Sequence, residues 1–128
     1  MPAPTILYIE DDFQNRVLVR RVLEASGFSF IGAENGLMGI QLAQEHVPDL
    51  ILMDINLPEM DGYEVTSRLK QIETLAHVPI VAMTANVMKG DREKSLDAGC
   101  DGYIQKPINV DLLPEQISQF LAYRSQTP

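Results

Sequence analysis

Acidic side chains directly follow apolar segments of this chain at two places. Asp54 ends one such segment, and the adjacent pair Glu10 and Asp11 follows another. Thr84 and Lys106 end two further segments. Clustered carboxylates without histidine or cysteine favour a hard divalent cation such as Mg²⁺, which keeps open coordination positions. If these residues meet in space, an ion held in this way leaves room for a phosphoryl group at its open positions.

Five short apolar segments rich in β-branched residues alternate with helical patterns along the chain. This alternation predicts βαβ units and an α/β fold with a parallel sheet covered by helices on both faces. Central strands of such a sheet are nearly continuous apolar runs, as the first, third and fourth segments are. The predicted strands cover residues 5–10, 28–33, 50–54, 79–84 and 102–106.

The carboxyl ends of parallel strands lie at one edge of the sheet, with neighbouring strands about 4.8 Å apart. We therefore expect the acidic pair, Asp54, Thr84 and Lys106 to lie close together. Two carboxylates about 5 Å apart repel by about 3 kcal/mol at an effective dielectric constant of about 20. Lys106 would offset part of this repulsion, and a bound divalent cation would offset the rest.

Apolar residues at helical spacing predict the buried faces of the helices between the strands. These residues are Leu18, Val22 and Ala25 in the first helix, Leu37, Ile40 and Ala43 in the second, and Val65, Leu69 and Ile72 in a third over residues 62–74. Asn109 is the expected N-cap of the last helix, with Pro114 in its first turn. The segment from Met88 to residue 97 is mostly charged and is predicted to be the least stable helix.

Composition limits the classes of partner. The chain has 128 residues and a formal net charge of −8, which disfavours nucleic acid and anionic membranes, since both attract basic surfaces. The single cysteine, Cys100, cannot form an intramolecular disulfide, and no apolar run approaches the length of about 20 residues that spans a membrane. The beginning of the chain lacks the basic and apolar regions of a signal peptide. We expect a single domain in the cytoplasm.

In combination, these residues resemble the receiver domain of two-component response regulators. The shared motifs are the acidic pair, Asp54 followed by Pro58 and by Met60, Asp61 and Gly62, then Thr84 with Ala85, and Gly102 with Tyr103 before Lys106 and Pro107. The resemblance covers about residues 5–123 and implies one receiver domain over residues 1–128. It also implies the flavodoxin-like receiver fold, with strand order 2-1-3-4-5. One departure is Glu10, at a position where aspartate is often found.

The resemblance implies that Asp54 is the phosphoacceptor and takes a phosphoryl group from phosphohistidine on a sensor histidine kinase or a histidine phosphotransfer protein. Asp54 and Asp11 would ligate Mg²⁺ directly, Glu10 would act through a water molecule, and the Asn56 backbone carbonyl would complete the protein ligands. Lys106, often followed by a cis peptide in this family, would contact the phosphoryl group.

Thr84 and Tyr103 match the switch pair of the family, which links phosphorylation to a changed protein-binding surface. Asn56 and Asn86 occupy positions that tune phosphoryl lifetime. Output would then pass to a downstream protein partner, or the phosphoryl group would be passed on. Such a domain catalyses only its own phosphorylation and dephosphorylation and is not otherwise an enzyme.

Simpler interpretations remain open at this stage. Asp12 can be only a helix cap, and Tyr103 can be only a packing aromatic residue. Three arginines of the first helix can form a docking surface or a solvated face: Arg16, Arg20 and Arg21.

A phosphatase of the haloacid dehalogenase kind also uses a strand-end aspartate with Mg²⁺, but it expects aspartate at the position of Asn56. A flavin carrier would want a glycine-rich phosphate loop, and an interaction module without phosphorylation is a further alternative. We expect a stand-alone receiver, with a part cut from a larger hybrid protein as the alternative.

Overall fold

The computed structural model describes residues 3–57, 60–85 and 91–126, and its main feature is one parallel sheet of five strands. The strand order is β2-β1-β3-β4-β5, as the resemblance implied, and all neighbouring pairs are parallel. The predicted strand limits agree with the observed ones to within one residue. The strands are β1 (Thr5–Ile9), β2 (Ser29–Ala33), β3 (Leu50–Asp54), β4 (Ile80–Thr84) and β5 (Gly102–Gln105).

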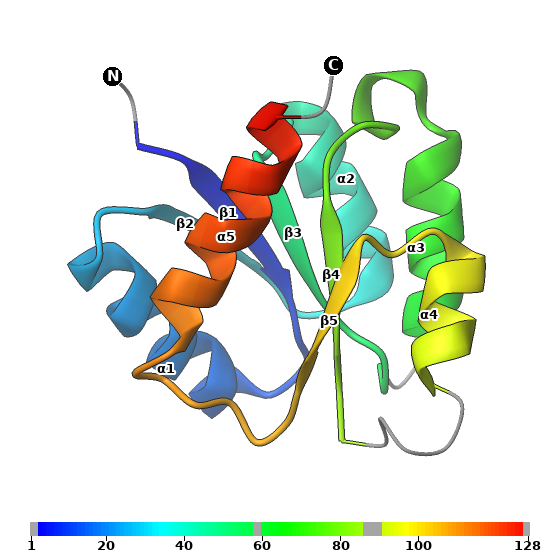
Figure 1. The fold of residues 1–128 in the computed structure, drawn as a ribbon. Coiled ribbons are helices and arrows are strands. Elements are labelled where there is room, and N and C mark those ends of the chain that lie inside the picture. The colour runs from blue at the N-terminus through cyan, green and yellow to red at the C-terminus, as the bar shows by residue number, and fades with distance from the viewer. Residues whose placement is uncertain (1–2, 58–59, 86–90, 127–128) are drawn as a thin grey trace.

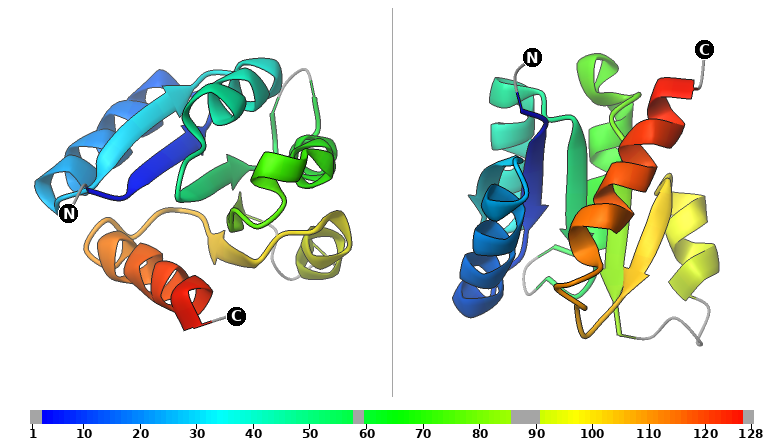
Figure 2. Two further views of the ribbon diagram at one scale, coloured as in Figure 1. Left: turned by 90° about the horizontal axis from the view of Figure 1, so that it is seen from above. Right: turned by 60° about the vertical axis from the view of Figure 1, so that its left-hand side comes forward.

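Helices cover both faces of the sheet (Figures 1 and 2). The side chains of α1 and α5 pack into one core with Ile6 and Tyr8, and those of α2 and α3 pack into a second core with Leu7 and Ile9. The alternation of β1 side chains between the two cores follows from the two-residue period of a strand. The helices are α1 (Phe13–Ala25), α2 (Gly36–His46), α3 (Gly62–Gln71), the 3₁₀ turn η1 (Glu73–Leu75), α4 (Asp91–Ala98) and α5 (Leu113–Gln126).

The buried face of α1 differs from the predicted one. Val19 and Leu23 are fully buried, whereas Leu18 is 44% exposed and Ala25 is also exposed. The sequence offers two apolar stripes, because residues 18 and 19 are both apolar and so are residues 22 and 23. The stripe that contains Val19 and Leu23 faces the sheet and packs against residues of β1 and β3.

The inward face of α2 is also partly different. Leu37 was predicted to point inward but is 60% exposed, while Ala43 is buried and Ile40 is half-buried against the core as predicted. Small residues allow α2 to approach the sheet closely. A Cβ atom on Gly39 would lie 2.7 Å from Ile9 Cγ1, so a side chain at this position would displace Ile9 from the core. The glycines of the buried face therefore set the rotation of the helix, and Leu37 lies outside that face.

α3 is shorter than predicted, and α4 ends one residue later than predicted. α3 ends at Gln71 because Ile72 adopts an extended conformation (φ −82°, ψ 119°), and the 3₁₀ turn follows. The described part of α4 begins at Asp91, and the predicted start at Met88 lies outside the described residues. The prediction that this helix is the least stable one remains a prediction.

Asn109 is not the N-cap of the last helix as predicted, because α5 begins four residues later, at Leu113. Asn109 Oδ1 accepts a hydrogen bond of 3.1 Å from the backbone N–H of Asp111, and Asn109 thereby caps the turn that leads into the helix. Leu113 and Ile117 are buried against the sheet. Pro114 lies in the first turn of α5, where a missing N–H donor costs nothing.

Candidate functional site

The carboxyl edge of the sheet gathers the polar residues that the sequence singled out. Glu10, Asp54 and Thr84 are buried there, with exposed fractions of 1%, 3% and 1%. Asp11, beside them, is exposed. One carboxylate oxygen from each of Glu10, Asp11 and Asp54 lies within 4.8 Å of the others. The strand arrows in Figure 1 end at this edge, so the sheet itself brings the acidic residues together.

Asp54 is held by the backbone that follows it. Its Oδ1 accepts a hydrogen bond of 3.1 Å from the backbone N–H of Asn56. Gly62, the first residue of α3, packs against this turn. A Cβ atom on Gly62 would lie 2.6 Å from the Asp54 carbonyl oxygen and 2.7 Å from Ile55 Cα. Since backbone atoms cannot move aside as a side chain can, this contact requires glycine. Asp61 caps α3 by accepting the N–H of Tyr63 at 2.8 Å.

Lys106 connects the acidic residues of two different strands. Its Nζ lies 3.1 Å from Glu10 Oε1 and 3.3 Å from Asp54 Oδ1. Its backbone N–H donates a 2.8 Å hydrogen bond to the carbonyl of Thr84, which ties the end of β5 to the end of β4. The peptide bond between Lys106 and Pro107 is cis, as the resemblance implied.

Glu10 has two further donors that the sequence analysis did not identify. The Tyr8 hydroxyl donates to Glu10 Oε1 at 3.2 Å, and Asn15 Nδ2 donates to the same oxygen at 2.9 Å. Arg16 also donates to the Glu10 backbone carbonyl and lies over the Phe13 ring. The Tyr8 contact could have been predicted from the sequence, because side chains two residues apart on a strand lie on the same face and Tyr8 is two residues before Glu10. The Asn15 contact depends on where α1 lies against β1, which no local pattern gives.

Burial and mutual repulsion give the carboxyls of Asp54 and Glu10 different pKa values. Burial, together with the neighbouring Glu10, raises the pKa of Asp54 to about 7, against the opposing effects of the Asn56 N–H and Lys106. Burial also acts to raise the pKa of Glu10, but hydrogen bonds with Asp54, Asn15 and Lys106 outweigh it and lower this pKa to about 2. Two carboxylates so close cannot both ionise easily, so the pair holds one proton at mildly acidic pH.

These donors fit a divalent cation. Carboxylate oxygens from three residues converge, two of the three side chains are buried, and one lysine ammonium lies between those two. Lys106 neutralises only part of the negative charge of these carboxylates. A Mg²⁺ ion bound by their oxygen atoms would neutralise the rest. The donor set contains oxygen atoms only, as Mg²⁺ prefers.

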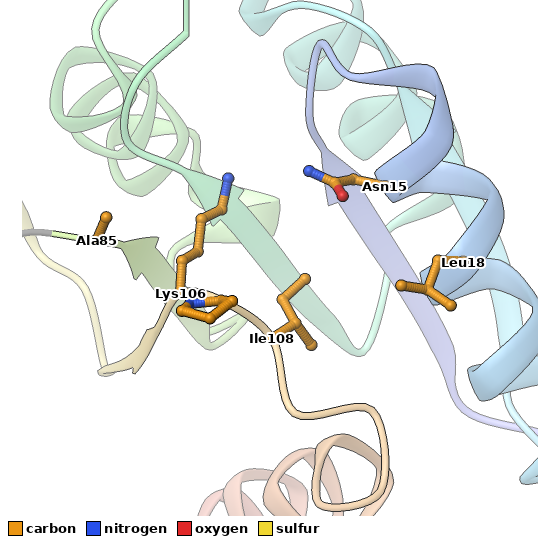
Figure 3. A pocket seen from close by; sticks show the side chains of 6 residues that line it. Asn15, Leu18, Ala85, Lys106 and Ile108 are labelled. Carbon is orange, nitrogen blue, oxygen red and sulfur yellow. The ribbon is translucent and has the colours of Figure 1, made fainter.

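A pocket of about 400 Å³ opens beside the acidic residues (Figure 3). Asn15 from α1 and Lys106 from the other side direct their nitrogen ends toward the same region. The remaining wall is largely apolar. The lining residues are Asn15, Leu18, Ala85, Lys106, Pro107 and Ile108. The pocket lies between α1 and the segment that follows β5, directly beside the acidic residues.

The other predicted site residues lie near this edge or outside the described chain. Thr84 ends β4, one residue after the partner of Asp54 in the strand register. Tyr103 is half-buried in β5 and packs against the core that contains α2 and α3. The side chain of Asn56 is exposed. Two sequence positions of the resemblance lie outside the described residues: Pro58 and Asn86.

The strand order and the acidic carboxyl edge together define a receiver-type α/β domain, and comparisons with known proteins agree. Residues 6–118 match the family described as response regulator receiver domain. Two curated relatives are the polar-differentiation response regulators DivK of Brucella anthropi and Brucella ovis. Each is 48% identical over 117 residues, which cover 91% of this chain and 95% of the relative.

Solved structures show the same fold. A CheY-like receiver domain protein from Methanospirillum hungatei matches with a TM-score of 0.89 and 27% identity, covering 97% of this chain and 98% of that chain. The receiver domain of a sensor histidine kinase from Pseudomonas aeruginosa matches with a TM-score of 0.86 and 32% identity, covering 94% of this chain and 98% of that chain. The chain belongs to the response regulator receiver domain family.

Membership of this family gives the chain a phosphoacceptor role in two-component signalling. It is a regulatory domain, and nothing in the comparisons favours the phosphatase or the unphosphorylated module. Within the described residues, every helix is too short or too polar to cross a membrane.

Proposed function

We propose that Asp54 is the residue that accepts the phosphoryl group. The observation that carries this proposal is the position of Asp54, a buried carboxylate at the end of β3 with Lys106 Nζ 3.3 Å from its Oδ1 and two further carboxylates beside it. Phosphoryl transfer asks a protein mainly to position the reacting groups and to neutralise charge on the phosphoryl oxygens. The residues around Asp54 are suited to both tasks.

In the proposed reaction, a carboxylate oxygen of Asp54 attacks the phosphorus of a phosphohistidine on a partner protein. The phosphorus–nitrogen bond breaks, the imidazole leaves, and an acyl phosphate forms on Asp54. Lys106 would hold a phosphoryl oxygen through its ammonium group, and the hydroxyl of Thr84 would donate to another. The chain would catalyse this step, and the later loss of the phosphoryl group to water, only on itself.

Magnesium belongs to the same proposal. Asp11 and Asp54 would hold the ion directly, Glu10 would hold it through a water molecule, and the Asn56 backbone carbonyl would complete the protein ligands. When bound, Mg²⁺ supplies positive charge to the phosphoryl oxygens. The convergence of the three carboxylates supports this assignment. The matching receiver domain from Pseudomonas aeruginosa is described with a magnesium ion coordinated in its active-site cleft.

Thr84 and Tyr103 are the proposed switch residues. Thr84 is buried at the end of β4, and Tyr103 lies half-buried on the neighbouring strand β5. In the proposed switch, the Thr84 hydroxyl moves toward the new phosphoryl oxygens, and the Tyr103 ring follows into the space that becomes available. This movement would change the surface formed by α4, β5 and α5, to which a downstream protein partner would bind.

The phosphoryl donor would dock at the opening beside Lys106. Leu18 and Ile108 give the pocket wall an apolar surface, and Arg20 and Arg21 are exposed on α1, the helix that supplies Leu18 to this wall. We propose that a sensor histidine kinase or a histidine phosphotransfer protein presents its phosphohistidine there. The proposal treats residues 1–128 as one receiver domain in the cytoplasm, a location that the single buried Cys100 supports because no intramolecular disulfide is available.

The proposed function is tested by incubating the protein with acetyl phosphate and Mg²⁺ and measuring the intact mass. The protein should gain one phosphoryl group, which is stable to acid and labile to alkali, and EDTA should prevent the gain. A protein that gains no group in the presence of Mg²⁺ contradicts the phosphoacceptor assignment. A gain of the same size in EDTA contradicts the role of the metal.

A further inference from the structure

We propose that Tyr8 and Asn15 are positioning residues that hold the Glu10 carboxylate in place for magnesium binding. The inference rests on the proposed function, since it concerns the ion that the acidic residues would bind. Neither residue reaches the ion or the phosphoryl group in this scheme. Each acts through Glu10. Glutamate has a longer side chain than aspartate, the other acidic residue found at this position in the family.

Three donors meet at a single oxygen of Glu10. Tyr8 Oη lies 3.2 Å, Asn15 Nδ2 2.9 Å and Lys106 Nζ 3.1 Å from Glu10 Oε1. These contacts commit Oε1 to the protein, so in the proposed scheme the second oxygen, Oε2, would serve the cation. A glutamate has one more rotatable bond than an aspartate, and fixing that bond in advance saves conformational entropy when the ion binds.

The phenol of Tyr8 is placed for this contact by the strand itself. Glu10 directly follows β1 and is two residues after Tyr8, and the extended backbone there brings both side chains to the same face of the sheet. The Tyr8 ring is fully buried and packs edge-on against Phe30, with ring centroids 6.4 Å apart. A phenylalanine would fill this core position equally well, and a buried hydroxyl is unfavourable unless it is hydrogen-bonded. The contribution of the Tyr8 hydroxyl is therefore its hydrogen bond to Glu10.

Asn15 is placed by the N-terminus of α1. Asp12 caps this helix, and its Oδ1 accepts the backbone N–H of Asn15 at 3.0 Å. The Asn15 side chain then extends over the end of β1 and donates to Glu10 from the direction of the pocket (Figure 3). Tyr8 reaches Glu10 from the core side, and Asn15 reaches it from the solvent side. The carboxylate is thus held between two donors whose positions are fixed by different elements.

The test compares the magnesium dissociation constants of Tyr8→Phe and Asn15→Ala with that of the wild-type protein by isothermal titration calorimetry. Loss of a partner of a metal ligand typically weakens metal affinity 10- to 100-fold, and we expect about 10-fold for each variant. Thr66→Val is the matched control, because it removes a buried hydroxyl that donates to Gly62 O at 2.9 Å on the other side of the sheet. This control should bind magnesium as the wild type does, whatever its effect on stability.

A second measurement separates positioning from general structure. For Tyr8→Phe, the rate of phosphorylation by acetyl phosphate at saturating Mg²⁺ should be close to that of the wild type, while the Mg²⁺ concentration that gives half of this rate should rise about 10-fold. In a Glu10→Asp background, Tyr8→Phe should cause no further loss of magnesium affinity, because the shorter carboxylate does not reach the phenol.

The inference is overturned if Tyr8→Phe and Asn15→Ala both bind magnesium as tightly as the wild type does. It is also overturned if Tyr8→Phe causes the same loss in the Glu10 and Glu10→Asp backgrounds. A wild-type protein that binds no magnesium contradicts the proposed function itself, so the two failures are distinguishable. Because Asn15 lies at the helix surface, its variant remains informative if Tyr8→Phe disturbs the core.

Discussion

Lys106 Nζ lies 3.1 Å from Glu10 Oε1, although the two residues are 96 positions apart in the sequence. Burial acts to lower the pKa of Lys106, but the charges and hydrogen bonds of Asp54 and Glu10 outweigh it and raise this pKa above its ordinary value. The ammonium therefore stays charged at neutral pH. A single fixed cation lies between two buried carboxylates, which leaves negative charge for a metal ion to neutralise.

The shared proton of Asp54 and Glu10 should make magnesium binding depend on pH. The pKa of Asp54 is raised to about 7, so below that pH the proton must leave before the ion can bind. The dissociation constant should then increase by about tenfold for each pH unit below about pH 7 and change little above it. Calorimetric titrations from about pH 5 to about pH 8 would show this slope. A flat affinity over this range would contradict the shared proton.

The Asp54 carboxyl should lower the stability of the metal-free protein. The pKa of Asp54 rises from 3.8 to about 7 on folding, so the folded state binds the proton more tightly and loses stability as pH rises between these values. Asp54→Asn should therefore increase the free energy of unfolding at pH 7 by on the order of 2 kcal/mol. Urea unfolding in EDTA measures this difference. The difference should shrink toward pH 4, and a constant difference would show that the cause is not ionisation.

The acidic site could be predicted from the sequence because its position depends on topology rather than on detailed packing. A parallel sheet brings the carboxyl ends of its strands to one edge, so Glu10, Asp54, Thr84 and Lys106 had to approach one another once the strands were recognised. The strand order itself came from the resemblance. Hydrophobic periodicity gave only a parallel sheet, since it carries no information on which strands are neighbours.

The rotation of two helices could not be predicted, for two different physical reasons. In α1, neighbouring apolar residues offered two equivalent stripes, and Val19 rather than Leu18 faces the core. In α2, the close approach of Gly39 to the sheet turned Leu37 outward. The Asn15 donor of Glu10 was missed for a related reason, because its hydrogen bond depends on how α1 lies against β1.

Lys106→Ala should impair activation more than it impairs metal binding. The ammonium would contact the phosphoryl group directly, and a hydrogen bond to a charged group contributes about 1.5 to 3 kcal/mol, which corresponds to about a 10- to 100-fold change in the population of the activated state. Amide chemical shifts of Thr84 and Tyr103, recorded with acetyl phosphate, measure that population. Magnesium affinity, measured on the same variant, should change less. The opposite order would assign Lys106 a structural role.

Gly62→Ala should disturb the acceptor turn. The added Cβ would lie 2.6 Å from the Asp54 carbonyl oxygen, and the backbone must shift to relieve this contact. We expect a loss of about 1 to 3 kcal/mol in the free energy of unfolding and slower phosphorylation. Gly32→Ala is a suitable control, because the nearest atoms to its Cβ belong to side chains, which can move. Equal losses in the two variants would contradict the proposed packing of α3 against the turn.

The identity of the phosphorylated residue tests the central claim most directly. The wild-type protein and Asp54→Asn should be incubated side by side with acetyl phosphate and Mg²⁺, and their intact masses compared, with circular dichroism confirming that both are folded. The proposed role of Asp54 predicts one phosphoryl group per chain on the wild type and none on Asp54→Asn. A folded Asp54→Asn variant that gains the same group at the same rate would contradict it.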